Sequence, residues 1–82
     1  MQVVGVEVSE SALAGLSRRL DLLGEAELAR RITAAIEDGR DQLTFTGHEQ
    51  VAILSALVNP PADLHELHRA LLLAWARRPQ VL

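Results

Sequence analysis

The sequence has no cysteine and no lysine, and aromatic residues make up only 2% of it. Without cysteine the chain can form neither a disulfide nor a thiolate metal site. The scarcity of aromatic side chains argues against a binder of single-stranded nucleic acid, because such proteins stack bases on aromatic rings. All eight cations are arginine, which is typical of a GC-rich bacterial genome, and the formal net charge of −3 disfavours general nucleic-acid binding.

Long hydrophobic runs and the features of a leader peptide are missing as well. No apolar run approaches the roughly 18 residues of a membrane-spanning helix. The N-terminal residues do not combine a basic flank with a long apolar stretch, as a secretory signal peptide does. We therefore expect a cytoplasmic protein without a membrane partner.

The chain is rich in small and branched aliphatic residues. Hydrophobic residues make up 49% of its 82 positions, mostly leucine, alanine and valine. This length predicts a single domain over residues 1–82. A domain of this size buries only about 60% of the surface that its unfolded chain exposes, so close helix packing or self-association is expected to support it.

The order of the hydrophobic patterns predicts an α+β fold that is mostly helical. The same strand–helix–helix unit is expected twice, with one repeat over about 2–39, a second over about 41–78, and a tail at 79–82. Strands are expected at 2–8 and 42–46, and helices at about 10–23, 25–38, 47–58 and 64–77. We expect the two short strands to pair antiparallel with each other and to pack with the four helices, because isolated strand edges are unstable.

Local signals mark where the helices begin. Ser9 has the position of an N-cap, whose side chain accepts a hydrogen bond from an unpaired backbone N–H. Thr46 with Glu49, and Asp63 with Glu66, have the spacing of a capping box. Single glycines and the "NPP" run predict the helix ends.

No combination of residues indicates catalysis or a cofactor. The chain shows no catalytic triad, nucleophile elbow or glycine-rich phosphate loop, so we predict a protein that is not an enzyme. His65 and His68 lie one turn apart on a helix, and His48 begins another helix. Only two of these three candidate ligands have supporting spacing, so we predict no metal site and no cofactor. The arginine pairs indicate solvated helix faces, with Glu27 and Arg31 spaced as a helical ion pair.

The second half of the chain has more apolar surface than one core-facing stripe requires. Helices three and four are apolar on more than one side, which predicts a surface that a partner covers. The chain is therefore predicted to be a non-catalytic protein–protein interaction module that forms a homodimer or larger homo-oligomer, or that binds another protein. The alternative is that helix four is the central helix of the monomer, with Trp75 in its core. The predicted partner-binding residues are Val51, Leu54, Val58, Leu72, Leu73 and Trp75.

The run "GVEVSESALAGLSRRLDLLGEAELARRITAAIEDG" resembles a ribbon-helix-helix unit: a short strand, a capped helix, a tight turn and a second helix. Residues 2–38 would be one unit and 42–76 a second, so that one chain is similar to the dimer of that family. The resemblance implies paired antiparallel strands in the major groove of DNA, and a transcriptional regulator or antitoxin. Gln42, Thr44 and Thr46 would then read the bases.

Carboxylates in the matching positions depart from that family pattern. Glu7 would face phosphate-rich surroundings from the first strand. Glu25 and Asp63 lie where the family sets a helix N-terminus against phosphate, and their charge stabilises the helix but repels DNA. DNA binding is therefore the second hypothesis, behind protein–protein interaction.

Overall fold

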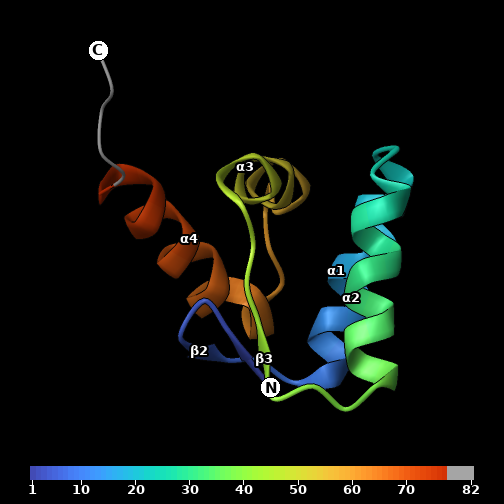
Figure 1. Cartoon of the computed structure of the whole chain (residues 1–82). Helices are drawn as coiled ribbons and strands as arrows, with labels where there is room; N and C mark the ends of the chain where they lie inside the picture. Colours follow the sequence, from blue (N-terminus) through green and yellow to red (C-terminus); the bar gives the residue numbers. More distant parts are fainter. Residues whose placement is uncertain (78–82) are drawn as a thin grey trace.

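The computed structural model describes residues 1–77, and its fold is α+β and mostly helical (Figure 1). Residues 78–82, which include the predicted tail 79–82, lie outside the described residues. Within the described part of the chain, every helix is too short or too polar to cross a bilayer. The elements are β1 (Gln2–Val3), β2 (Val6–Glu7), α1 (Glu10–Leu22), α2 (Ala26–Glu37), β3 (Gln42–Leu43), α3 (Gly47–Ala56), a 3-10 turn (Ala62–Leu64) and α4 (His65–Arg77).

The three short strands form one sheet in the order β2-β1-β3. β1 and β2 are antiparallel, with Gln2 opposite Glu7. β1 and β3 are parallel, and Val3 lies beside Leu43. The predicted antiparallel pairing of the first strand with the second was therefore wrong, and so was the prediction of one continuous strand over 2–8.

A tight turn explains the difference. Val4 and Gly5 both have positive φ, 51° and 81°, which is the backbone of a two-residue hairpin loop. The first predicted strand therefore folds back on itself, and β2 occupies one edge of β1. The α1–α2 hairpin then returns the chain to the other edge, where β3 runs in the same direction as β1, as a helical crossover permits.

Two of the three predicted caps are confirmed. Ser9 Oγ accepts a hydrogen bond from the Ala12 N–H at 3.2 Å. Thr46 and Glu49 form the complete capping box, with the Thr46 N–H donating to Glu49 Oε1 at 2.9 Å. The predicted box at Asp63 was wrong, because a 3-10 turn that follows Pro61 precedes α4 and places Asp63 inside that turn.

One hydrophobic core joins the helices to the sheet. In Figure 1, α1 and α2 lie side by side at one side of the molecule, α4 lies at the other side, and α3 lies between them. Leu13, Leu16 and Leu20 recur at helical spacing, which predicts that they form the core-facing stripe of helix one. This prediction is confirmed, because all three side chains are completely buried. The largest fully buried side chains are Leu13, Leu16, Leu20, Ile32, Ile53, Leu57, Leu64, Leu67, Leu71 and Val3.

The two predicted repeats differ in three dimensions. The order of strand, helix and helix recurs along the chain. The first two helices are adjacent and antiparallel, whereas α3 and α4 diverge from each other in Figure 1. The first unit also carries a hairpin where the second carries one short strand. The internal repeat stays a prediction of the sequence pattern.

Two glycine substitutions test the hairpin. Gly5→Ala should lower the free energy of unfolding by about 1–2 kcal/mol, because a Cβ is held in left-handed backbone. Gly15→Ala is the matched control: an added Cβ on α1 meets no atom within 4 Å, and alanine should raise the free energy of unfolding by about 0.5–1 kcal/mol. Urea denaturation of the wild type and the two variants measures both changes in the free energy of unfolding. If both substitutions changed it in the same direction, the left-handed backbone at Gly5 would be contradicted.

Candidate functional site

Exposed aliphatic side chains lie on α3 and α4 and in the segment that directly follows α3. Val51 is 41% exposed, Val58 is 70% exposed, and Leu72 and Leu73 are 46% and 49% exposed. The side chains that face the core are different ones, and they include Ile53 on α3, which is completely buried. Both helices therefore carry a second set of aliphatic side chains that the monomer leaves in contact with solvent.

The other two predicted partner-binding residues are half-buried. Leu54 packs against the core from the side of α3. Trp75 lies near the end of α4 and is half-buried as well. Val51 and Leu54 lie one turn apart on α3. The predicted helix over 47–58 is shorter in the structure, because α3 ends at Ala56, and Val58 therefore lies beyond the helix.

A hollow of about 460 Å³ lies between the beginning of α3 and the end of α4. It is lined by Gly47, His48, Gln50, Val51, Ala74 and Trp75. Among residues 1–77, its lining contains no carboxylate and no guanidinium, and the His48 imidazole is its one titratable group. Such a hollow can accept an apolar side chain of a partner, with the Gln50 amide and the His48 ring as possible hydrogen-bonding groups.

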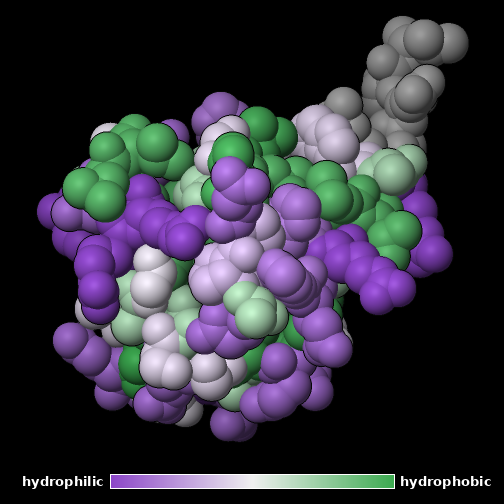
Figure 2. Space-filling model, turned by 180° about the vertical axis from the view of Figure 1, so that it is seen from behind, coloured by the Kyte–Doolittle hydropathy of each residue, from purple (hydrophilic) through white to green (hydrophobic). Residues whose placement is uncertain are grey.

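The part of the apolar surface of α3 and α4 that lies on the outward face of α4 is called the α4 ridge. It consists of exposed residues at helical spacing, with two leucines between two arginines. Seen from behind, hydrophobic surface lies over this helix next to strongly hydrophilic surface (Figure 2). The members of the α4 ridge are Arg69, Leu72, Leu73, Ala76 and Arg77.

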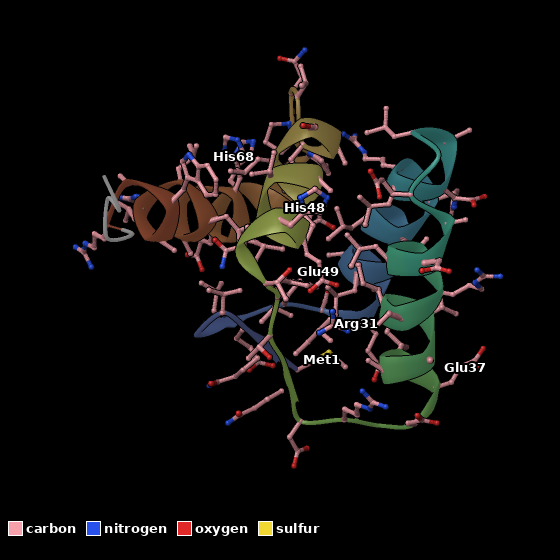
Figure 3. The ribbon with its side chains drawn as sticks, turned by 45° about the horizontal axis from the view of Figure 1, so that its top comes forward. Met1, Arg31, Glu37, His48, Glu49 and His68 are labelled. Atoms are coloured by element: carbon pink, nitrogen blue, oxygen red, sulfur yellow. The ribbon has the colours of Figure 1, made fainter. Side chains whose placement is uncertain are left out.

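Arg31 on α2 fixes the beginning of α3. Its guanidinium pairs with the Glu49 carboxylate, donates to the Thr44 carbonyl at 2.6 Å and lies 5.9 Å from the centre of the Phe45 ring. Arg31 and Glu49 point toward each other across the space between α2 and α3 (Figure 3). The sequence had paired Arg31 with Glu27, one turn away on the same helix. The tertiary partner is Glu49, whose carboxylate the capping box already holds in place.

This contact changes the acidity of Glu49. The hydrogen bond from Arg31 holds the pKa of the Glu49 carboxyl below its ordinary value of 4.5. Partial burial acts in the opposite direction, and the hydrogen bond from the Thr46 backbone lowers the pKa further. The ionised carboxylate is therefore the form that the folded state favours.

The three histidines do not gather at one point. Figure 3 shows His48 on α3 and His68 on α4, and His65 Nε2 lies 2.9 Å from the Pro60 carbonyl oxygen. Among residues 1–77, no three histidine, aspartate or glutamate side chains come close enough together to hold a metal ion.

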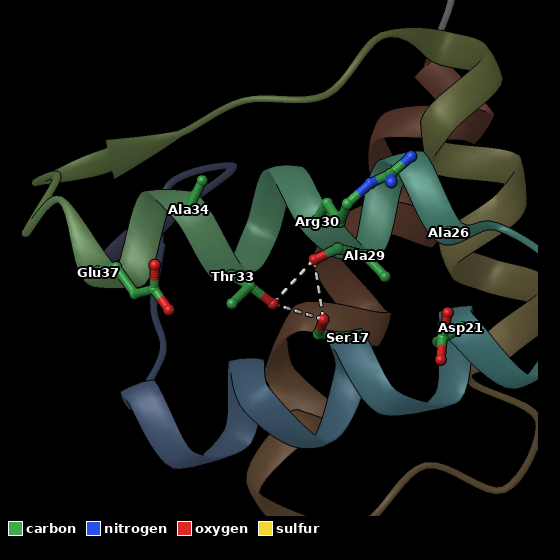
Figure 4. A pocket seen from close by; sticks show the side chains of 8 residues that line it. All are labelled: Ser17, Asp21, Ala26, Ala29, Arg30, Thr33, Ala34 and Glu37. Atoms are coloured by element: carbon green, nitrogen blue, oxygen red, sulfur yellow. Dashed lines mark hydrogen bonds between the residues drawn. The ribbon is translucent and has the colours of Figure 1, made fainter.

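A second surface feature, which the sequence reasoning missed, lies on the outer side of the α1–α2 hairpin. We call it the α1–α2 groove, a hollow of about 600 Å³ (Figure 4). Ser17 Oγ donates to the Ala29 carbonyl at 2.9 Å, Thr33 Oγ1 donates to the same oxygen at 3.0 Å, and the two hydroxyls lie 3.0 Å apart. The lining residues are Ser17, Asp21, Ala26, Ala29, Arg30, Thr33, Ala34 and Glu37.

The sequence does contain a signal for this groove. Ala26, Ala29 and Thr33 recur at helical spacing on α2, which puts small side chains in one row. Two exposed leucines were missed as well: Leu22 is 84% exposed and Leu23 is 55% exposed at the turn between α1 and α2. They directly follow the buried stripe of helix one, and they precede Gly24.

Comparison with known proteins gives no match to any family model, curated protein or solved structure. The resemblance to the ribbon-helix-helix family therefore stays a prediction from the sequence. The parallel pair of β1 and β3 differs from the antiparallel ribbon that this resemblance implies. Gln42, Thr44 and Thr46 are exposed, as base-reading residues would have to be.

The contact between Arg31 and Glu49 predicts a pH dependence of stability. Because the folded-state pKa of Glu49 lies below its unfolded value, the contact stabilises the fold above about pH 4.5, and this contribution is lost as the pH falls through the folded-state pKa. At pH 7, Arg31→Met should lower the free energy of unfolding by about 1–2 kcal/mol, a range reduced for partial solvent exposure.

A double-mutant cycle with Glu49→Gln measures this coupling by urea denaturation at pH 7 and at about pH 3. We expect a coupling energy at pH 7 that shrinks at the acidic pH, where the carboxylate becomes protonated. Additive effects of the two substitutions at pH 7 would show that the contact does not stabilise the fold.

Proposed function

We propose that this chain is a small, non-catalytic protein–protein interaction module whose partner covers the apolar surface of α3 and α4. One observation carries the proposal: large aliphatic side chains are between 41% and 70% exposed on two neighbouring helices and directly after one of them. They are Val51 on α3, Leu72 and Leu73 on α4, and Val58 just beyond the end of α3. Solvent-exposed apolar area of this kind is typical of protein interaction sites.

The way these residues are held supports the proposal. Buried side chains on the inner faces of α3 and α4 fix both helices, so the outward side chains are arranged before a partner arrives. A rigid surface of this kind loses little conformational entropy on binding. The hollow beside Val51 and Trp75 would accept one anchoring side chain, and the surrounding aliphatic groups would exclude water from it.

The proposal includes a non-catalytic role and the cytoplasmic location that the sequence predicts. Support for the non-catalytic role comes from the placement of the titratable groups. The part of the lining that the structure describes holds one imidazole and no carboxylate, whereas general acid–base chemistry with two groups needs both close to the same reacting atom. Cell fractionation with an antibody against the chain tests the location.

A DNA-binding regulator or antitoxin remains the alternative from another functional class. No contact among the described residues favours it over protein binding, and the net charge of −3 acts against it. If DNA were captured with the chain, the polar residues in and after β3, which include Thr44, would be the first ones to substitute.

The decisive experiment is an affinity capture from the native cells with the wild-type chain and two variants. Leu72→Glu places a charge in the proposed surface, and it should remove at least about 90% of a stoichiometric protein partner, since a buried unpaired charge costs several kcal/mol. Leu22→Glu is the matched control, because it makes the same change at a more exposed leucine outside α3 and α4. Circular dichroism confirms that each variant is folded.

Half of each sample is treated with nuclease, and both proteins and DNA are identified. A partner that survives nuclease, is retained by Leu22→Glu and is lost with Leu72→Glu supports the interaction module. A specific DNA fragment without a protein partner would favour the regulator instead. Equal capture by both variants would show that the α3–α4 surface is not the binding site.

A further inference from the structure

The α4 ridge and the α1–α2 groove have complementary shapes and charges, although they lie on different helices of the chain. The ridge is a convex row with two leucines at its centre. The groove is a concave row with small residues at its floor. We propose that the α4 ridge of one copy binds in the α1–α2 groove of another, so that the partner of this module is a second copy of the same chain. This inference rests on the proposed function and names the partner.

The ridge offers apolar groups between two positive charges. Leu72 and Leu73 are about half exposed, at 46% and 49%. Arg69 and Arg77 flank them and are exposed, and within residues 1–77 neither guanidinium forms an ion pair. Eight residues separate the two arginines, which places them about 12 Å apart along the helix axis.

The groove offers the opposite arrangement. Ala26 and Ala34 are exposed and short, so the backbone of another helix can approach α2 closely. Figure 4 shows Asp21 near one end of the groove and Glu37 at the other. Eleven residues of α2 separate Ala26, beside Asp21, from Glu37, which corresponds to about 16 Å along the helix axis. The two carboxylates therefore lie toward opposite ends of the groove, as the two arginines lie at opposite ends of the ridge.

The distribution of charge along the chain favours the same contact. Residues 1–41 contain eight of the eleven acidic residues and five of the eight arginines, so the whole net charge of −3 lies in the half that contains the groove. Arg30 lies on the groove rim between the two carboxylates, but Glu25 and Glu27 come shortly before it on the same hairpin. The ridge therefore approaches a surface of opposite sign.

A symmetric contact between two α4 ridges fits less well. Arg69 lies one turn before Leu72 and Leu73 on the same face, so two ridges packed together would enclose Arg69 from both copies. The outward face of α4 has Glu66 as its one carboxylate, at the far end from Arg77. Enclosing a guanidinium without a partner is costly, whereas the groove supplies carboxylates.

Because ridge and groove are different surfaces, the contact is head-to-tail. Each copy that binds through its ridge still presents a free groove, so association continues past two copies into rings or open chains. A symmetric dimer would stop at two. Head-to-tail association therefore has its own signature, an average mass that keeps rising above that of a dimer as concentration increases.

Sedimentation velocity of the purified full chain over about 10 μM to about 1 mM, the range of weak interfaces, tests the inference. The double variant Arg69→Glu/Arg77→Glu reverses the charge of the ridge. The double variant Asp21→Lys/Glu37→Lys reverses the charge of the carboxylates at the two ends of the groove. Each double variant alone should associate at least about tenfold more weakly than wild type, because like charges then meet. Arg18→Glu/Arg40→Glu is the matched control for the ridge variant, with the same change in net charge outside both surfaces, and it should associate as wild type does.

Mixing supplies the second readout. An equimolar mixture of the ridge variant and the groove variant should regain association, since each reversed surface now meets an opposite charge. Association of wild type should also weaken at about 1 M NaCl, where screening acts over about 3 Å. A wild-type chain that stays monomeric up to the highest concentration would overturn the inference. A groove variant that associates as strongly as wild type would overturn it too, and would indicate contact between two α4 ridges.

These outcomes are separate from the test of the interaction module itself. If wild type is monomeric but Leu72→Glu still removes a captured protein, the head-to-tail inference fails and the proposed function stands. If Leu72→Glu alters neither capture nor self-association while the chain stays folded, both fail together.

Discussion

The parallel pairing of β1 with β3 is the contact that brings the two halves of this chain together. It consists of only two residue pairs, yet Val3 is completely buried and Leu43 is nearly so, at the point where the sheet meets the helices. The α1–α2 hairpin lies in the connection between these strands, and only three residues separate the end of β3 from the beginning of α3. The positions of all four helices therefore depend on where β3 lies beside β1.

Arg31 extends this constraint from the sheet to the candidate site. By binding both Glu49 and the Thr44 carbonyl, it attaches α2 to the segment that leads into α3. The capping box holds the same Glu49 carboxylate, so one group joins a local helix-start signal to a tertiary contact. With the beginning of α3 fixed, Val51 projects toward the end of α4, and the two helices enclose the hollow that Trp75 lines.

The two surfaces that result differ in a way that matches their chemistry. α3 and the α4 ridge carry aliphatic side chains beyond those that the core uses, whereas the outer face of the α1–α2 hairpin carries small residues and carboxylates. A chain with so small a core gains from covering apolar surface through association. The two proposals are thus related: the first states that α3 and α4 bind a protein, and the second states that this protein is another copy of the chain, bound head-to-tail.

The sequence by itself determined the helices, most of their caps and the side chains that face the core. Leu13, Leu16 and Leu20 form the buried stripe that their spacing predicts, because helical periodicity and capping are local properties. Tertiary structure alone decided the pairing of the strands, the choice of Glu49 over Glu27 as the partner of Arg31, and the groove on the α1–α2 hairpin. Each of these depends on how distant segments meet, and a two-residue strand or a single ion pair carries too little local information to specify its partner.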